Sequence, residues 1–319
     1  MIVHLPYPKI PSRHDGSTPA PAGTWVATEK IHGANLTIAT DGESVRVGKR
    51  KAWLEPGDDF FGWQLLRVEL EEAARTVRHA LGLGVSGPRD VVRLYGELFG
   101  GHYPHADVPP APGASPVQTG VWYAPDVRFA LFDILIEDGS HEIFLAHSEV
   151  VELAKKAGLF VCPMLARGPR RALELALFDR PHGGATWVPT LLGLPPLPVN
   201  RAEGVVLKPD ARTPYASRYI VKHRDLDLDD CELATSTAAV LDLEGFQTRA
   251  AAMITPSRIA SARSKVGTST DAICNEVVLD ILLDLEAVFP VTFALLGTAE
   301  EERLRSHMAT LAAIALRVP

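Results

Sequence analysis

The alternation of hydrophobic and polar residues divides this chain into a longer part with strands and helices and a shorter part with helices alone. Between residues 24 and 222, short apolar runs typical of strands are interrupted by stretches with helical periodicity. Beyond about Asp229 the strand signals stop, and Gly and Pro become rare. The pattern therefore predicts two domains, residues 1–228 and residues 229–319.

Strands and helices are mixed along the first domain, and this order indicates an α+β fold. After a lead-in rich in Pro, Ser and Gly, residues 24–50 show hairpin-like alternation with a turn at Asp41-Gly42. A helix is predicted between Ser148, as its N-cap, and Gly158. The other elements expected here are helices at residues 62–82 and 171–178 and strands at Val91–Phe99, Arg128–Ile136, Gly204–Lys208 and Tyr219–Lys222.

The second domain is predicted to be a small all-helical domain. Three segments have helical periodicity: Ser257–Val266, Asp271–Val288 and Glu300–Leu316. Thr298 and Glu301 have the spacing of a capping box at the start of the last segment. We therefore expect that segment to begin near Thr298 and to bury one apolar stripe.

Composition places the chain among globular proteins. It has 319 residues, of which 46% are hydrophobic, but no apolar run approaches the roughly 20 residues that span a bilayer. The first residues have neither a basic start nor a long apolar stretch, so we expect no signal peptide. Three widely spaced cysteines form no zinc or disulfide pattern. These features predict a cytoplasmic protein that does not contact membranes.

The net charge of −7 gives no support to a broad nucleic-acid-binding surface, since such proteins are often basic. A local basic groove around one active site remains compatible with this charge. Any inference about nucleic acid must therefore come from motifs.

The run from Thr28 to Asn35 is the strongest candidate for chemistry. Lys30 stands just before a Gly turn, between two strand-like segments. A lysine is a nucleophile only when burial or neighbouring positive charge depresses its pKa, and residues 49–51 supply three such charges across the predicted hairpin. The alternative for an isolated lysine is a solvated side chain at a strand end.

Further fragments follow Lys30 in a fixed order: Tyr95-Gly96-Glu97-Leu98, Leu131-Phe132-Asp133-Ile134, Glu203-Gly204-Val205-Val206-Leu207-Lys208 and Val221-Lys222-His223-Arg224. Together they resemble the ordered motifs of covalent nucleotidyltransferases. The Lys-x-His-Gly-x-Asn form at residues 30–35 resembles the RNA ligase 2 branch of that superfamily. The resemblance covers residues 24–224 and implies an α+β domain built on antiparallel sheets, the nucleotidyltransferase or ATP-grasp-like ligase fold, followed by a helical module.

The resemblance also implies roles around the nucleophile. Lys30 would attack the α-phosphorus of ATP and carry AMP as a lysyl-AMP phosphoramidate. Glu29 would lie near adenine, and His32 and Gly33 would form the motif turn. Asn35 would assist sealing, and Arg50 would bind a polyphosphate or the 5'-phosphate of the strand.

Four later fragments would complete the site. The resemblance gives Glu97 the ribose hydroxyls, with a structural pair to Arg93 as the alternative. Phe132 would stack on adenine, and strand alternation would turn Asp133 to the opposite face. Glu203 would hold a divalent metal and Lys208 a phosphate. They are five residues apart, so we expect Glu203 to precede the strand or the strand to bend at Gly204.

Lys222 and Arg224 would stabilise charge that develops on the α-phosphate. The family pattern is Lys-x-Lys, so Arg224 is a departure, and a register with Lys222 as the second basic residue stays open. The helical tail also separates this chain from DNA ligases and capping enzymes, which usually append a β-barrel.

The resemblance implies an ATP-dependent RNA ligase that uses Mg²⁺ or Mn²⁺ and acts on nicked RNA duplexes or RNA ends. A related alternative is a ligase for DNA or RNA/DNA hybrid nicks. An alternative of another class is a nucleotide- or RNA-binding protein without ligase turnover. Protein partners and oligomeric state are not indicated.

Overall fold

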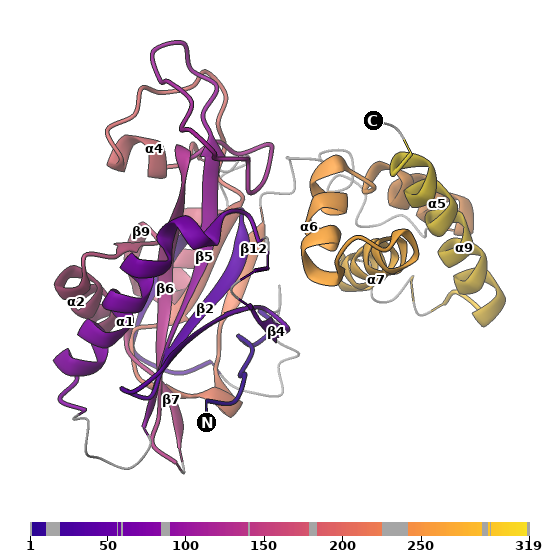
Figure 1. Cartoon of the computed structure of the whole chain (residues 1–319). Coiled ribbons are helices and arrows are strands. Elements are labelled where there is room, and N and C mark those ends of the chain that lie inside the picture. The colour runs from indigo at the N-terminus through magenta and orange to yellow at the C-terminus, as the bar shows by residue number, and fades with distance from the viewer. Residues whose placement is uncertain are drawn as a thin grey trace. The chain divides into compact units, whose positions relative to one another are not determined.

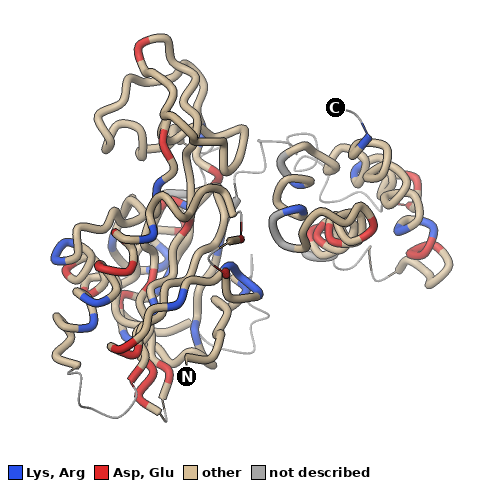
Figure 2. Tube along the Cα trace, viewed as in Figure 1, with Lys and Arg blue, Asp and Glu red and all other residues tan. Residues whose placement is uncertain are grey.

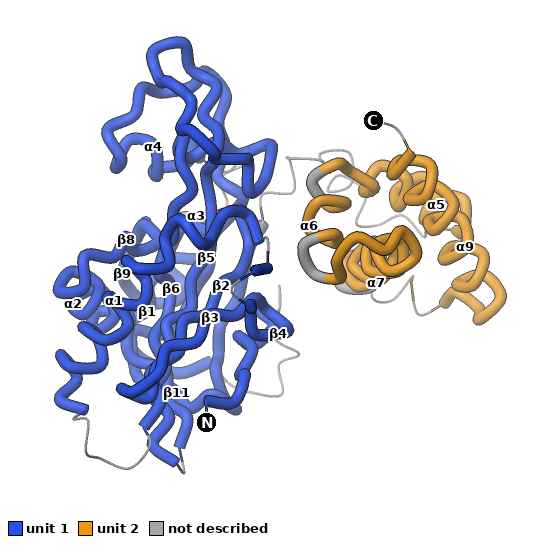
Figure 3. Tube along the Cα trace, viewed as in Figure 1, with its two compact units in different colours: residues 1–225 blue, residues 226–319 orange. Residues whose placement is uncertain are grey.

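The chain folds into two compact units, residues 1–225 and 226–319 (Figure 3). A computed structural model describes residues 2–10, 20–55, 57–58, 60–83, 90–139, 141–178, 184–224, 242–288, 293 and 295–317. The predicted boundary between residues 228 and 229 lies outside the described residues. No described helix is both long and apolar enough to cross a membrane.

Unit 1 is built on two sheets (Figure 1). The four-stranded sheet has the order β12 (Val221–Arg224), β10 (Gly204–Pro209), β1 (Thr24–Lys30) and β9 (Met164–Pro169). The eight-stranded sheet has the order β11 (Thr213–Pro214), β7 (Glu142–Phe144), β6 (Ala124–Glu137), β5 (Val91–His102), β2 (Ala34–Thr40), β3 (Val45–Lys49) and β4 (Ala52–Trp53), with β8 (Phe160–Val161) parallel to β6. The other strand pairings are antiparallel, so unit 1 has the α+β class that the sequence predicts.

The chain crosses from one sheet to the other between β1 and β2. The hairpin predicted over residues 24–50 is formed by β2 and β3 alone, because β1 pairs with β9 and β10 instead. Residues 31–33 make this crossing directly after Lys30. The sequence alone could not predict this crossing, because β1 and β2 have the same alternation of apolar and polar residues.

Helices cover the outer faces of the two sheets. α1 (Arg67–Ala80), which follows the 3-10 turn η1 (Trp63–Leu66), and α2 (His147–Ala157) bury apolar residues against the eight-stranded sheet. α3 (Arg170–Phe178) packs on β1 and β9. The short α4 (Val188–Leu191) and η2 (Tyr215–Ser217) lie in the connections that flank β10 and β11.

The N-cap of α2 is Ala146, not Ser148 as predicted. The Ser148 hydroxyl bonds to Asp210 Oδ1 instead, 3.2 Å away, while the Glu149 carboxylate accepts the Ala146 N–H at 3.0 Å. The helix ends at Gly158 with a φ of 70°, as the sequence predicts.

The described residues of unit 2 form α5 (Leu243–Ala252), α6 (Pro256–Val266), α7 (Thr270–Val288) and α9 (Thr298–Ala315) around one apolar core. The three helices predicted for this part are confirmed, and α5 was not expected. The cap of α9 lies one residue before the predicted box, because the Glu300 carboxylate accepts the Gly297 N–H at 3.1 Å.

Gly96 in β5 is expected to tolerate no side chain. An added Cβ would lie 2.2 Å from Phe129 Cζ and 2.5 Å from the Ala130 carbonyl oxygen. We expect Gly96→Ala to lower the free energy of unfolding by about 1–3 kcal/mol through overpacking, measured by urea denaturation. Gly168→Ala, in β9, is the matched control, since a Cβ there meets nothing within 4 Å. Equal stability of the two variants would contradict this packing.

Candidate active site

Lys30 is held at the end of β1 by a carboxylate from the next strand of its sheet. Its Cα pairs with Gly204 of β10, and its Nζ donates a hydrogen bond of 2.5 Å to Glu203 Oε2. The Lys30 side chain is 20% exposed and that of Glu203 10%, so the ion pair is largely buried but still accessible to solvent. β10 begins at Gly204, and Glu203 therefore precedes the strand, one of the two arrangements expected from the sequence.

The turn after Lys30 brings β2 close to β5. An added Cβ at Gly33 would lie 1.9 Å from the Leu98 carbonyl oxygen, so only glycine fits this approach. The His32 N–H donates to the Tyr123 hydroxyl at 2.8 Å, and His32 Nδ1 is 3.6 Å from Glu203 Oε2. The turn thus aims both a histidine and a lysine at one carboxylate.

Glu97 is a second carboxylate near this pair. It lies opposite Asn35 in the β2–β5 ladder. Burial raises the pKa of Glu97 to about 7; the Glu203 charge adds to the rise, whereas Lys30, Arg50 and Asn35 oppose it. The alternative pair with Arg93 is wrong, because the Arg93 guanidinium binds Glu137 at 2.6 Å. Glu97 is therefore electrostatically coupled to the lysine, and its contact with the ribose hydroxyls stays a prediction.

Two of the other candidate cations, Lys222 and Arg224, lie on β12 of the same sheet as Lys30, and the third, Arg50, follows a strand of the eight-stranded sheet. Arg224 pairs with Gly204, so the Cα atoms of Lys30, Gly204 and Arg224 form one row across β1, β10 and β12. Lys222 pairs with Val206 and is half-buried. Arg50 is exposed just after β3. The Arg224 side chain lies outside the described residues, so the division of roles between Arg224 and Lys222 stays a prediction.

Glu29 is directed away from Lys30 into a buried contact. Its Oε1 accepts the Thr186 hydroxyl, and its Oε2 accepts the Trp187 N–H at 2.9 Å. Burial raises the pKa of Glu29, although both hydrogen bonds lower it. The carboxylate anchors the segment before α4, a contact that the sequence did not indicate, and both of its oxygens are already engaged.

Phe132 and Asp133 lie at an irregularity of β6. The β5–β6 register shifts between Tyr95 and Gly96, so Phe132 is an extra residue opposite β5. The predicted opposite orientation of the pair is wrong, because both side chains contact Tyr7: its hydroxyl donates to Asp133 at 2.5 Å and its ring centroid lies 4.8 Å from that of Phe132. A bulge of this kind cannot be seen in the alternation of the sequence.

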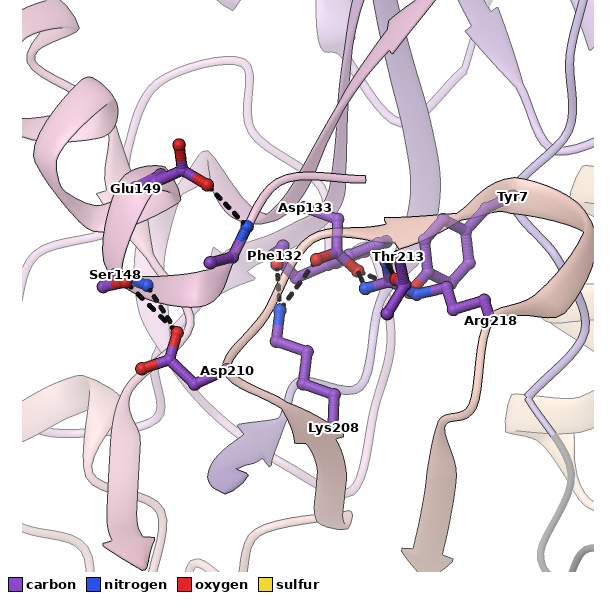
Figure 4. Close-up of polar contacts among 10 residues, drawn as sticks. Tyr7, Phe132, Asp133, Ser148, Glu149, Lys208, Asp210, Thr213 and Arg218 are labelled. Atoms are coloured by element: carbon purple, nitrogen blue, oxygen red, sulfur yellow. Dashed lines mark hydrogen bonds and ion pairs between the residues drawn. The ribbon is translucent and has the colours of Figure 1, made fainter. Parts of the chain in front are cut away.

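Lys208 lies in the interior beside this bulge. Its Nζ donates to the Phe132 carbonyl oxygen at 2.6 Å and to Asp133 Oδ1 at 2.8 Å, and the residue is 3% exposed (Figure 4). Lys208 and Glu203 lie at opposite ends of β10, and the structure does not bring them together. The geometry therefore supports a structural role for Lys208, which holds the Phe132 backbone, and not the predicted binding of a phosphate.

Three residues of this region were missed in the sequence. Tyr7 and Arg218 both bind Asp133, and Tyr123 binds the turn at His32. Tyr7 falls in the Pro- and Ser-rich lead-in, where the apolar Ile2, Leu5 and Tyr7 were the one available signal of packing.

The described residues contain no cluster of three or more His, Cys, Asp or Glu that could hold a metal by itself. Glu203, with Glu97 nearby, offers one or two carboxylates. That donor set fits Mg²⁺ or Mn²⁺, which commonly bind one or two carboxylates together with substrate phosphates. Glu203 and Glu97 are the residues that would hold such an ion.

Comparisons with known proteins agree with the ordered motifs. The sequence model described as RNA ligase matches residues 23–224. Mitochondrial RNA-editing ligase 2 of Trypanosoma brucei brucei is 36% identical over 204 residues, which cover 58% of this chain and 48% of that protein. Mitochondrial RNA-editing ligase 1 of the same organism is 34% identical over 214 residues, which cover 59% and 45%. The chain thus spans about half the length of these curated relatives.

The matched solved structures have low sequence identity and low TM-scores. A variant of the Naegleria gruberi RNA ligase with ATP and Mn is 16% identical, with a TM-score of 0.41 over 63% of this chain and 50% of that one. An archaeal ATP-dependent RNA ligase is 15% identical, with a TM-score of 0.43 over 97% of this chain and 63% of that one.

The raised pKa of Glu97 predicts a pH-dependent stability. Its pKa is 4.5 in the unfolded chain and about 7 when folded, so the folded state loses stability as the pH rises through this interval. Glu97→Gln cannot ionise and is expected to gain on the order of 2 kcal/mol relative to wild type between pH 5 and pH 8. Denaturant unfolding at both pH values measures this. Glu69→Gln, on the exposed side of α1, is the control, and a Glu97→Gln difference independent of pH would contradict the assignment.

Proposed function

Since this chain belongs to the RNA ligase family, we propose that it is an ATP-dependent ligase that joins a 3'-hydroxyl to a 5'-phosphate in RNA. The breaks it seals are nicks in duplex RNA, through a lysyl-AMP intermediate and an adenylylated 5' end. One observation supports this most strongly: Lys30 is fixed at a strand end against Glu203, with Glu97 close by. The matched relatives carry the name RNA-editing ligase.

In the first step, Lys30 Nζ forms a bond to the α-phosphorus of ATP and pyrophosphate leaves. The ammonium must first lose a proton, while the Glu203 carboxylate, bonded to it at 2.5 Å, holds Nζ at the strand end. A bound Mg²⁺ or Mn²⁺ supplies charge neutralisation of the phosphates. His32 Nδ1 lies 3.6 Å from the same carboxylate.

In the second step AMP passes from Lys30 to the 5'-phosphate of the strand. In the third, the neighbouring 3'-hydroxyl attacks that phosphate and AMP leaves. Lys222 and Arg224 stabilise negative charge on the transferred phosphate, and Arg50, exposed after β3, binds the strand's 5'-phosphate. Phe132 stacks on adenine.

Residues 1–228 are proposed as the adenylyltransferase domain and residues 229–319 as the separate all-helical domain. Acidic and basic residues are interspersed along both units (Figure 2). This distribution favours RNA contacts confined to the site in unit 1. We therefore expect the sealing rate to fall only modestly as the salt concentration rises, because few phosphates are contacted.

The lysyl-AMP step is tested with ATP labelled on the α-phosphate. We expect a labelled protein band on a denaturing gel that disappears in Lys30→Ala and persists in Lys155→Ala, an exposed lysine of α2. The protein must first be freed of AMP carried through purification, checked by intact mass. No wild-type label with ATP or GTP would favour a nucleotide- or RNA-binding protein without turnover.

The substrate class is tested with nicked duplexes of identical sequence. We expect sealing of the all-RNA nick at a rate at least about tenfold above the DNA nick, since a protein distinguishes the two through the 2'-hydroxyls. Hybrids with RNA on only one side of the nick show which side is read. Faster sealing of the DNA nick would instead establish the DNA ligase alternative.

A further inference from the structure

The first residues of the chain form a strap that packs on the eight-stranded sheet of unit 1. The strap, residues 2–10, is bonded through its backbone at two points: the Tyr95 hydroxyl donates to the Leu5 carbonyl at 3.0 Å and the Tyr215 hydroxyl to the Pro6 carbonyl at 2.6 Å. His4 lies 2.9 Å from the Lys49 carbonyl. These contacts hold Tyr7, which is 6% exposed, between Tyr95, Phe132 and Phe144.

Tyr7 completes a buried charge cluster around Asp133. Asp133 accepts hydrogen bonds from the Tyr7 hydroxyl at 2.5 Å, from Arg218 Nη2 at 2.5 Å and from Lys208 Nζ at 2.8 Å (Figure 4). The Arg218 guanidinium also lies 3.7 Å from the centroid of the Phe144 ring. One carboxylate thus organises two cations and one hydroxyl.

The cluster stays charged at neutral pH. Burial alone would raise the pKa of Asp133, but Arg218 and Lys208 outweigh it and lower that pKa below its ordinary value. Burial also raises the pKa of Tyr7 well above its ordinary value, so its hydroxyl remains a donor. Tyr7 and Arg218 therefore remain donors to Asp133 at neutral pH, whereas burial lowers the pKa of Lys208.

Phe132 is held on two sides by this cluster. Lys208 fixes its carbonyl oxygen at 2.6 Å, and the Tyr7 ring meets the Phe132 ring edge-on at 73°. Because Phe132 is the extra residue of a bulge, the β5–β6 ladder constrains its ring less than that of a regular strand residue. Contacts from outside the ladder must supply the missing constraint.

We propose that Tyr7 is a positioning residue of the nucleotide site, and that it sets the orientation of the Phe132 ring through Asp133 and direct ring contact. The strap is then a working part of the adenine site rather than an irregular lead-in. This rests on the proposed function in one respect, that Phe132 stacks on the base of ATP. Loss of the Tyr7 hydroxyl removes one of the two donors to Asp133 Oδ2 and weakens the cluster that holds Phe132, while Arg218 and Lys208 keep their bonds to the carboxylate.

Tyr7→Phe in the full chain tests the proposal. We expect the KM for ATP in lysyl-AMP formation to rise about tenfold, the effect of one lost hydrogen bond to a charged group, while the maximal rate changes little. The Kd for ATP, measured by calorimetry, should rise in parallel. Tyr7→Ala, which also removes the ring, should raise both further.

Tyr215→Phe is the matched control. It removes one tyrosine hydroxyl that also binds the strap, but at a backbone carbonyl and not at Asp133. We expect an unchanged KM for ATP in this variant, whatever its thermal stability. An equal KM and Kd in Tyr7→Phe and wild type would overturn the proposal, as would equal shifts in Tyr7→Phe and Tyr215→Phe.

Failure of the ligase proposal gives a different result. A wild type that binds ATP but forms no adduct overturns lysyl-AMP chemistry, and the Kd comparison of Tyr7→Phe with Tyr215→Phe still decides the role of Tyr7. A wild type that does not bind ATP overturns both.

Discussion

The antiparallel pairing of β1 with β10 is the constraint on which the candidate site depends. It sets Lys30 opposite Gly204, and so places the Glu203 carboxylate, one residue before the strand, on the Lys30 ammonium. The same ladder continues to β12, where Gly204 pairs with Arg224. A slip of one residue in either pairing would move one member of this row to the other face of the sheet. Register, more than any single side chain, therefore assembles the candidate nucleophile with its neighbours.

Two clusters of buried charged residues lie near this ladder, one around Lys30 and one around Asp133, and they differ in their surroundings. Near Lys30, burial raises the pKa of Glu97, and the charge of the second carboxylate, Glu203, adds to that rise. Two such carboxylates are suited to binding a divalent cation. Around Asp133, by contrast, three protein groups, Tyr7, Arg218 and Lys208, donate hydrogen bonds to one carboxylate. That cluster stabilises the local backbone conformation, including the bulge at Phe132.

Much of the site was predictable because its motifs are local in sequence. Lys30, His32 and Gly33 fall within one turn, and counting along Glu203–Lys208 left two arrangements, Glu203 before the strand or a bend at Gly204, of which the structure has the first. The contacts that could not be predicted join distant segments. Tyr7 and Asp133 are 126 residues apart, and Glu29 and Thr186 are 157 apart. The bulge at Phe132 likewise depends on the partner strand, so alternation within β6 alone predicts the wrong orientation.

The central claim is that Lys30 carries the nucleotide. Peptide mapping by mass spectrometry after incubation with ATP tests it most directly, since it locates the modified side chain rather than only detecting label. The account predicts AMP on the Nζ of Lys30 in the peptide that spans the β1–β2 crossing. AMP on any other residue, or ATP bound without an adduct in protein shown to be free of AMP beforehand, would contradict it.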